Sequence, residues 1–84
     1  ESMMNESYYS LPELPEGGQA RVRALHLTGG MRRRLQDLGL VAGTPVTCLQ
    51  RAASGDPTAY LIRGAVIALR QTDAEQVEMG VEDA

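Results

Sequence analysis

One short helix with a defined start is encoded by residues 28–44, TGGMRRRLQDLGLVAGT. Thr28 is placed to act as the N-cap, with its hydroxyl accepting a hydrogen bond from a free backbone N–H of the first turn. Met31, Leu35 and Leu38 fall at i, i+4 and i+7, so they form one apolar stripe. This spacing predicts a helix that packs one face against the core of the domain.

The end of the same helix is encoded by Gly39 and Leu40. Glycine adopts the left-handed conformation that ends many helices, and Leu40 is placed to fold back onto Leu35, as in a Schellman motif. We therefore expect Gly39 to be required for the fold.

Three consecutive arginines, Arg32, Arg33 and Arg34, occupy the first turns of this helix. The helix macrodipole is positive at that end and favours acidic side chains there. Because the arginines stand at the electrostatically unfavourable end, we expect them to serve a purpose other than helix stability.

The rest of the chain predicts short strands separated by turns. Pro12 and Pro15 keep residues 11–15 extended and lay Leu11 and Leu14 on the body. A single helical turn is expected at residues 72–75, with Thr72 as its cap and Glu75 completing a capping box. Five strands are expected at Gln19–Leu25, Pro45–Arg51, 58–63, 65–70 and 76–80, with a tight hairpin at Arg63-Gly64.

This pattern predicts a mainly β fold, a small barrel of about five strands with one short α-helix after the first strand. At 84 residues the chain has room for one domain. We expect a flexible N-terminal segment at 1–10, of which residues 1–2 are a candidate cloning remnant, a barrel domain at 11–80 and an acidic tail at 81–84. The predicted core is Val22, Leu25, Met31, Leu35, Leu38, Val46, Cys48, Leu61, Val66, Ile67, Leu69 and Val77.

Charge is unevenly distributed along the chain. The segment from Arg21 to Arg70 holds all eight arginines against Asp37 and Asp56, a net charge of +6, whereas the two ends hold nine acids and no base. A basic body is attracted to an acidic protein face or to phosphate, and acidic ends repel nucleic acid. Solvation of the termini explains the acidic ends equally well.

Three motifs give the chain a resemblance to a known family. The run RRRLQDLGLVAGT at 32–44, RAASGDP at 51–57 and RGAVIALR at 63–70 are similar, in order and spacing, to the FeoA family of ferrous iron transport protein A. The resemblance covers roughly residues 11–79 and implies an SH3-like barrel. Its structural motif positions here are Leu35, Leu38, Gly39, Gly43 and Gly64.

The resemblance also implies a function. FeoA-like proteins are small cytoplasmic partners of FeoB, a ferrous iron transporter of the membrane with a cytoplasmic G-domain. By this resemblance the chain is a protein-interaction module that activates or assembles the transporter without catalysis, recruited by it to the inner face of the membrane. The alternative is an SH3-like regulatory domain of an iron-dependent transcriptional repressor, although the chain shows no helix-turn-helix region.

The sequence itself offers little catalytic or metal-binding chemistry. Its one histidine, His26, and one cysteine, Cys48, would have to meet to form a nucleophile–base pair. Zinc sites need three or four ligands, and no pair stands at a coordinating spacing. We expect no enzymatic activity and no required cofactor, only weak or adventitious Zn or Fe at His26, on the surface or shared between the chains of a homodimer.

Binding to nucleic acid or membrane is not expected either. The aromatic side chains that stack on bases are scarce, and no apolar run approaches the length of a membrane span. The predicted contact surface for a protein partner is the exposed face of the helix together with the protruding turn that follows Ala53. Its residues are Arg32, Arg33, Gln36, Ser54, Gly55, Asp56 and Pro57.

Overall fold

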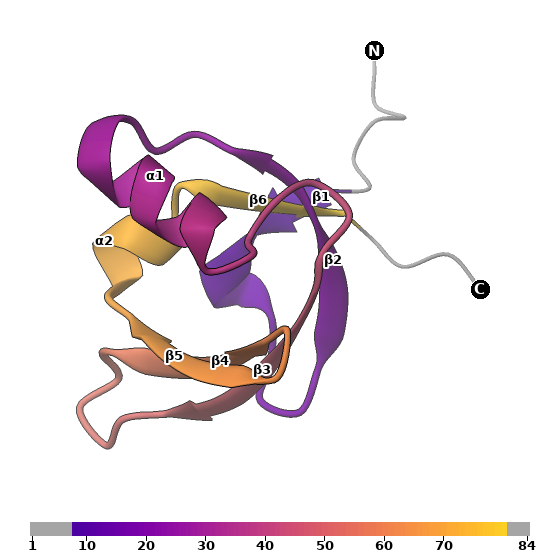
Figure 1. Ribbon diagram of the computed structural model, residues 1–84. Coiled ribbons are helices and arrows are strands. Elements are labelled where there is room, and N and C mark those ends of the chain that lie inside the picture. The colour runs from indigo at the N-terminus through magenta and orange to yellow at the C-terminus, as the bar shows by residue number, and fades with distance from the viewer. Residues whose placement is uncertain (1–7, 81–84) are drawn as a thin grey trace, which may run out of the picture.

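The computed structural model describes residues 8–80 of the chain. They form six strands, two short α-helices and one 3-10 turn (Figure 1). In chain order these are β1 (Tyr8–Ser10), η2 (Leu11–Glu13), β2 (Gln19–Leu25), α1 (Gly29–Asp37), β3 (Pro45–Arg51), β4 (Thr58–Ile62), β5 (Ala65–Leu69), α2 (Gln71–Ala74) and β6 (Val77–Gly80).

All six strands belong to one antiparallel sheet with the order β1-β6-β2-β3-β4-β5. The sheet curls around the core, and the two helices lie on one side of it (Figure 1). Two parts of the predicted fold are wrong. The sheet is not closed into a barrel, because the described residues form no ladder between β1 and β5.

The helix α1 follows the second strand, not the first, because an unexpected strand precedes it. Tyr8 and Tyr9, assigned to the flexible N-terminal segment, pair with Gly80 and Met79 of β6. Aromatic residues favour the half-buried surface of a sheet, so Tyr8 and Tyr9 are compatible with a strand. The polar residues before them favour a loose segment instead, which is why the strand is not predicted. The rest of the predicted N-terminal segment and the predicted acidic tail lie outside the described residues.

Strand prediction was otherwise accurate. The strands β2 and β3 have the predicted bounds, and β4 and β5 are each one residue shorter than expected. Arg63 and Gly64 both have positive φ values, 50° and 82°, as the tight hairpin between β4 and β5 requires.

The segment that begins at Leu11 is a 3-10 turn, not an extended run. The N–H of Leu14 donates to the carbonyl of Leu11 at 3.0 Å, and the N–H of Ser10 donates to a carboxylate oxygen of Glu13 at 3.2 Å. The fixed φ of Pro12 suits this turn. Leu11 and Leu14 are buried against the body, as expected.

The N-cap of the second helix lies two residues earlier than predicted. The N-cap is Arg70, not Thr72, and the side chain of Arg70 makes no capping hydrogen bond. A tertiary contact explains the shift, since a carboxylate oxygen of Asp56 accepts from the N–H of Gln71 at 3.0 Å. The first turn is therefore satisfied from the loop between β3 and β4.

Nine of the twelve predicted core residues are buried or pack partly buried against the core. The other three are exposed: Leu38, Leu61 and Val66. In β4 the buried positions are 58, 60 and 62, so Leu61 and its partner Val66 lie on the outer face of the sheet. Buried residues that were not in the predicted core include Leu27, Leu40, Tyr60, Ile62 and Met79.

Candidate interaction surface

The helix α1 ends in the predicted Schellman motif. The N–H of Leu40 donates to the carbonyl of Leu35 at 2.9 Å, and the N–H of Gly39 donates to that of Gln36 at 2.9 Å. Gly39 has a φ of 101°. The predicted start is only half right, because Thr28 is the N-cap by position but its side chain makes no capping hydrogen bond.

The three arginines of α1 have different surroundings. A guanidinium N–H of Arg32 donates to the backbone carbonyls of Leu25 at 2.6 Å and Leu27 at 3.3 Å. This contact ties the first turn of α1 to the end of β2. Arg33 is exposed and makes no hydrogen bond or ion pair within residues 8–80. Arg32 therefore makes hydrogen bonds that stabilise the fold, whereas the guanidinium of Arg33 is exposed and unpaired within the described residues.

The second half of the predicted surface, residues 54–57, lies away from α1. In Figure 1 this loop between β3 and β4 projects at the lower left, whereas α1 lies at the upper left. The loop is held by its own contacts, since the hydroxyl of Ser54 donates to the carbonyl of Asp56 at 2.9 Å and the carboxylate of Asp56 caps α2. The structure therefore presents the exposed residues Arg33 and Gln36 separately from the exposed 54–57 loop.

The structural motif residues occupy the turns that shape this region. Leu35 is buried, and Leu38 is 37% exposed at the end of α1. Gly43, with a φ of 92°, lies in the turn before β3, where its carbonyl accepts from Arg21 at 2.9 Å. Gly64 completes the hairpin between β4 and β5.

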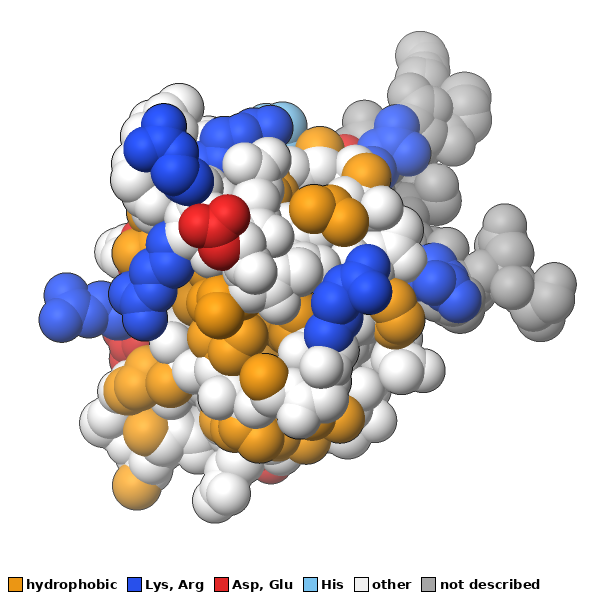
Figure 2. Space-filling view, in the orientation of Figure 1, with side chains coloured by type: hydrophobic (Ala, Val, Ile, Leu, Met, Phe, Trp, Pro, Cys, Tyr) orange, Lys and Arg blue, Asp and Glu red, His pale blue; other side chains and the backbone are white. Residues whose placement is uncertain are grey.

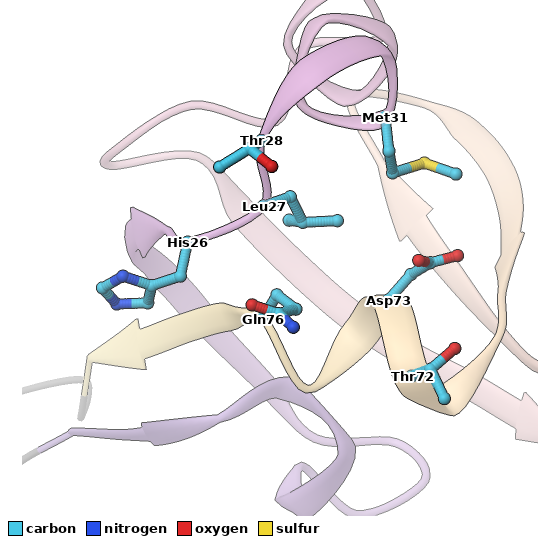
Figure 3. Close-up of a pocket in the computed structure, with 7 residues that line it drawn as sticks. All are labelled: His26, Leu27, Thr28, Met31, Thr72, Asp73 and Gln76. Carbon is cyan, nitrogen blue, oxygen red and sulfur yellow. The ribbon is translucent and has the colours of Figure 1, made fainter.

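His26 follows β2 and lies beside a carboxylate. Its Nε2 is 2.7 Å from Oε1 of Glu78, and the other carboxylate oxygen of Glu78 is 2.7 Å from Nε of Arg23. Figure 3 shows the pocket next to His26, with the imidazole ring directed away from Asp73 and Met31. No three metal-binding side chains gather anywhere in residues 8–80, so this pair offers a metal at most two ligands from one chain.

Cys48 and Tyr60 are buried in the core, on the neighbouring strands β3 and β4. Burial raises the pKa of the Cys48 thiol, with the charge of Arg51 acting in the opposite direction. Burial likewise raises the pKa of the Tyr60 hydroxyl. Both groups therefore stay protonated and enclosed near neutral pH, which is the environment of an inert core thiol.

Two hollows beside β5 were missed by the sequence analysis. The inner hollow, of about 280 Å³, lies between α1, β5 and α2. It combines the apolar side chains of Met31, Leu35 and Leu69 with Arg34, Arg70 and Asp73. Figure 2 shows this hydrophobic surface beneath α1 with basic side chains around it.

The outer hollow, of about 290 Å³, lies on the other face of β5, over the loop between β3 and β4. Its apolar lining is Ala52, Ala53, Pro57 and Ala59, and Ala68 of β5 lines both hollows. The sequence contains one indication of this surface. The run RGAVIALR at 63–70 has five consecutive apolar residues between its two arginines. In a sheet that does not close, such a strand lies at an edge and exposes part of this apolar surface.

The whole arrangement, an open antiparallel sheet with a short helix after β2, matches a known domain. A model of the FeoA domain matches residues 9–80. The chain belongs to the FeoA family. The structure of the FeoA protein from Chlorobium tepidum has a TM-score of 0.82 and 35% identity, with 86% of this chain and 69% of that chain covered.

Two further relatives extend this family assignment. FeoA from Stenotrophomonas maltophilia, an SH3 domain protein crystallised with zinc, has a TM-score of 0.75 and 30% identity over 83% of this chain and 87% of that chain. In Porphyromonas gingivalis, a fusion of Fe(2+) transport protein A with the Fe(2+) transporter FeoB is 35% identical over 69 residues. The match takes in 82% of this chain but only 8% of the fusion protein.

The fold is also shared with transcriptional repressors. A manganese-dependent repressor has a TM-score of 0.79 at 16% identity, with 89% of this chain and 42% of the repressor covered. At that identity the likeness concerns the fold alone. No helix within residues 8–80 is long and apolar enough to cross a membrane.

Proposed function

We propose that this FeoA-family chain is a cytoplasmic accessory protein of ferrous iron uptake that acts on the FeoB transporter by binding it, without catalysis. One observation carries the proposal: a relative with 35% identity is fused to FeoB in a single polypeptide. Fusion keeps two domains at a high effective concentration, which is useful when the two work in contact.

The surface supports a binding role over a catalytic one. The cysteine is buried in the core, the histidine is paired with Glu78, and α1 presents exposed polar and basic side chains at Arg33 and Gln36. Exposed charges of this kind steer association with an acidic partner. We propose that these two residues and the 54–57 loop contact the cytoplasmic G-domain region of FeoB, each as a separate part of the interface.

A pull-down with the cytoplasmic domain of FeoB, with and without nucleotide, tests the proposal. The expected result is retention of the wild-type chain and reduced retention of Arg33→Glu. Iron uptake by cells that carry only the Arg33→Glu variant should fall in parallel. The matched control is Arg33→Lys, which keeps the positive charge at the same position. Failure of the wild-type chain to bind FeoB in either nucleotide state would refute a direct contact.

Two accessory expectations belong to this proposal. Recruitment by FeoB would bring the chain to the inner face of the membrane without insertion. Any Zn or Fe bound by the isolated chain would be weak and adventitious, held at His26 or shared between two copies in a homodimer. Light scattering with and without Zn(II) measures the second of these directly.

A further inference from the structure

The strand β5 is an edge strand with outward-facing backbone groups. It pairs only with β4 and stands at one end of the sheet. The two-residue turn at 63–64 makes Ile62 and Ala65 a hydrogen-bonded pair, and pairing alternates from there. The N–H and C=O groups of Val66 and Ala68 therefore point away from β4, where the described residues offer them no partner.

The two hollows lie on opposite faces of this edge. An added strand directs its side chains alternately to the two faces of a sheet. One set would enter the inner hollow beside Arg34 and Arg70, and the other would enter the outer hollow over Ala59 and Pro57. This is the arrangement that lets an edge strand recognise an extended peptide, with main-chain bonds for affinity and pockets for selectivity.

The charges that line the hollows indicate which kind of peptide segment the β5 edge would bind. The inner hollow has two cations against one acid, Asp73, and neither Arg34 nor Arg70 forms an ion pair within residues 8–80. The outer hollow is lined by alanines and a proline together with Gln50 and Arg51, and the guanidinium of Arg51 is held by the carbonyls of Pro12 and Leu14. We propose that the β5 edge binds an extended segment of a partner protein in which acidic and apolar residues alternate.

A second copy of this chain fits the edge poorly. Antiparallel pairing of two β5 strands about Ile67 would place Arg70 of each copy opposite Gly64 of the other, one residue from that copy's Arg63, so arginines would come close together at both ends of the ladder. Like charges at such positions are destabilising. An acidic strand meets the same arginines as favourable partners.

This inference deepens the proposed function and rests on it only for the source of the segment, which would be FeoB. Binding of the segment is measured without the transporter. The probe is a fluorescein-labelled peptide, acetyl-EVEVEVEV, titrated with the full chain at low salt and followed by fluorescence anisotropy. The comparison peptides are EEEEVVVV, with the same composition and charge, and KVKVKVKV.

The variants separate the backbone from the charge contribution. Ala68→Pro removes one outward N–H from an edge strand that tolerates proline, and Ala68→Ser keeps it. The expected loss for Ala68→Pro is about fivefold or more in affinity, the effect of one hydrogen bond of about 1 kcal/mol. The double reversal Arg34→Glu, Arg70→Glu should abolish binding, and the charge-conserving control Arg34→Lys, Arg70→Lys should retain most of it.

Selective binding of EVEVEVEV with these losses, together with slowed exchange of the Val66 and Ala68 amides, supports the proposal. Equal binding of EEEEVVVV, or equal binding by Ala68→Pro and Ala68→Ser in variants that melt like the parent, would overturn it. Self-association that Ala68→Pro abolishes, without peptide binding, would assign the edge to a second copy instead. If FeoB retains the wild-type chain while the peptide does not bind, this inference fails and the proposed function stands.

Discussion

The side chain of Arg63 lies across Gly39. Its Nε donates to the carbonyl oxygen of Gly39 at 3.1 Å, and a Cβ built on Gly39 would collide with Cδ of Arg63. The same carbonyl accepts from the hydroxyl of Thr44 at 2.8 Å. The end of α1 is thus joined to the hairpin between β4 and β5 and to the turn before β3. Glycine is needed at position 39 for its φ and for this close approach.

We expect Gly39→Ala to lower the free energy of unfolding by about 1–2 kcal/mol, and Gly39→Val by more, because a Cβ is disfavoured at positive φ. A loss of this size lowers the melting temperature of a small domain by roughly 4–8 °C per kcal/mol. Denaturant unfolding measures both effects.

A double-mutant cycle separates the two reasons for glycine. In an Arg63→Ala background the collision is absent, so Gly39→Ala should lose only the part that comes from φ. An identical loss in both backgrounds would show that the approach of Arg63 does not constrain residue 39.

Arg32 and Arg33 should respond differently to mutation. Arg32→Ala removes a charged donor from the carbonyls of Leu25 and Leu27, so we expect it to destabilise the fold by about 1 kcal/mol. Arg33→Ala should change stability by less than about 0.5 kcal/mol, as is usual for surface positions. Thermal unfolding of the two variants side by side tests this difference, and equal stability would mean that the Arg32 contact contributes nothing measurable.

Periodicity and turn chemistry predicted most of the fold. The alternation in Gln19–Leu25 and the positions of Gly39 and Gly64 each depend on residues close in sequence, and the structure confirms all three. Sheet closure depends on whether β1 and β5 pair, which no local pattern encodes. The strand β1 is formed by its pairing with the distant β6, so its short sequence alone did not indicate it.

The candidate surface was harder to predict than the fold. A run of arginines shows that cations are present, but the carbonyls that bind Arg32 and the free position of Arg33 arise from the path of the chain between β2 and α1. The contact of Asp56 with α2 is likewise tertiary. For this reason the 54–57 loop could be predicted to protrude but not to lie away from α1.

Alkaline pH should destabilise the fold through two buried groups. Burial raises the pKa of Cys48 and of Tyr60 above their ordinary values of 9.0 and 10.0. The unfolded chain therefore loses these protons at lower pH than the folded one, so the stability they contribute is present below about pH 9 and lost as the pH rises. Urea midpoints should be flat between pH 7 and 8.5 and fall above pH 9.

The variants Cys48→Ala and Tyr60→Phe assign the two parts of this decline. Cys48→Ala should reduce the fall of the urea midpoint near pH 9, and Tyr60→Phe should reduce it near pH 10. Both substitutions also lower the overall stability because they change the core. As an independent check, the thiol should react with a disulfide reagent at pH 8 only after denaturant is added. Rapid reaction in the native protein would contradict the buried position of Cys48.

The last prediction concerns metal. Within residues 8–80 of one chain, His26 has one carboxylate beside it, that of Glu78, and this carboxylate is already bound by Arg23 at 2.7 Å. Two ligands fall short of the three or four that a zinc site uses, so we expect affinity weaker than micromolar by calorimetry. Arg23→Ala should strengthen Zn(II) binding by freeing Glu78 from a competing cation, and His26→Ala should abolish it.

Zinc-dependent dimerisation, seen by light scattering and lost in His26→Ala, would show that two chains share the ligands. A one-to-one site of micromolar or tighter affinity in the monomer, unaffected by His26→Ala, would place the metal elsewhere and refute this assignment.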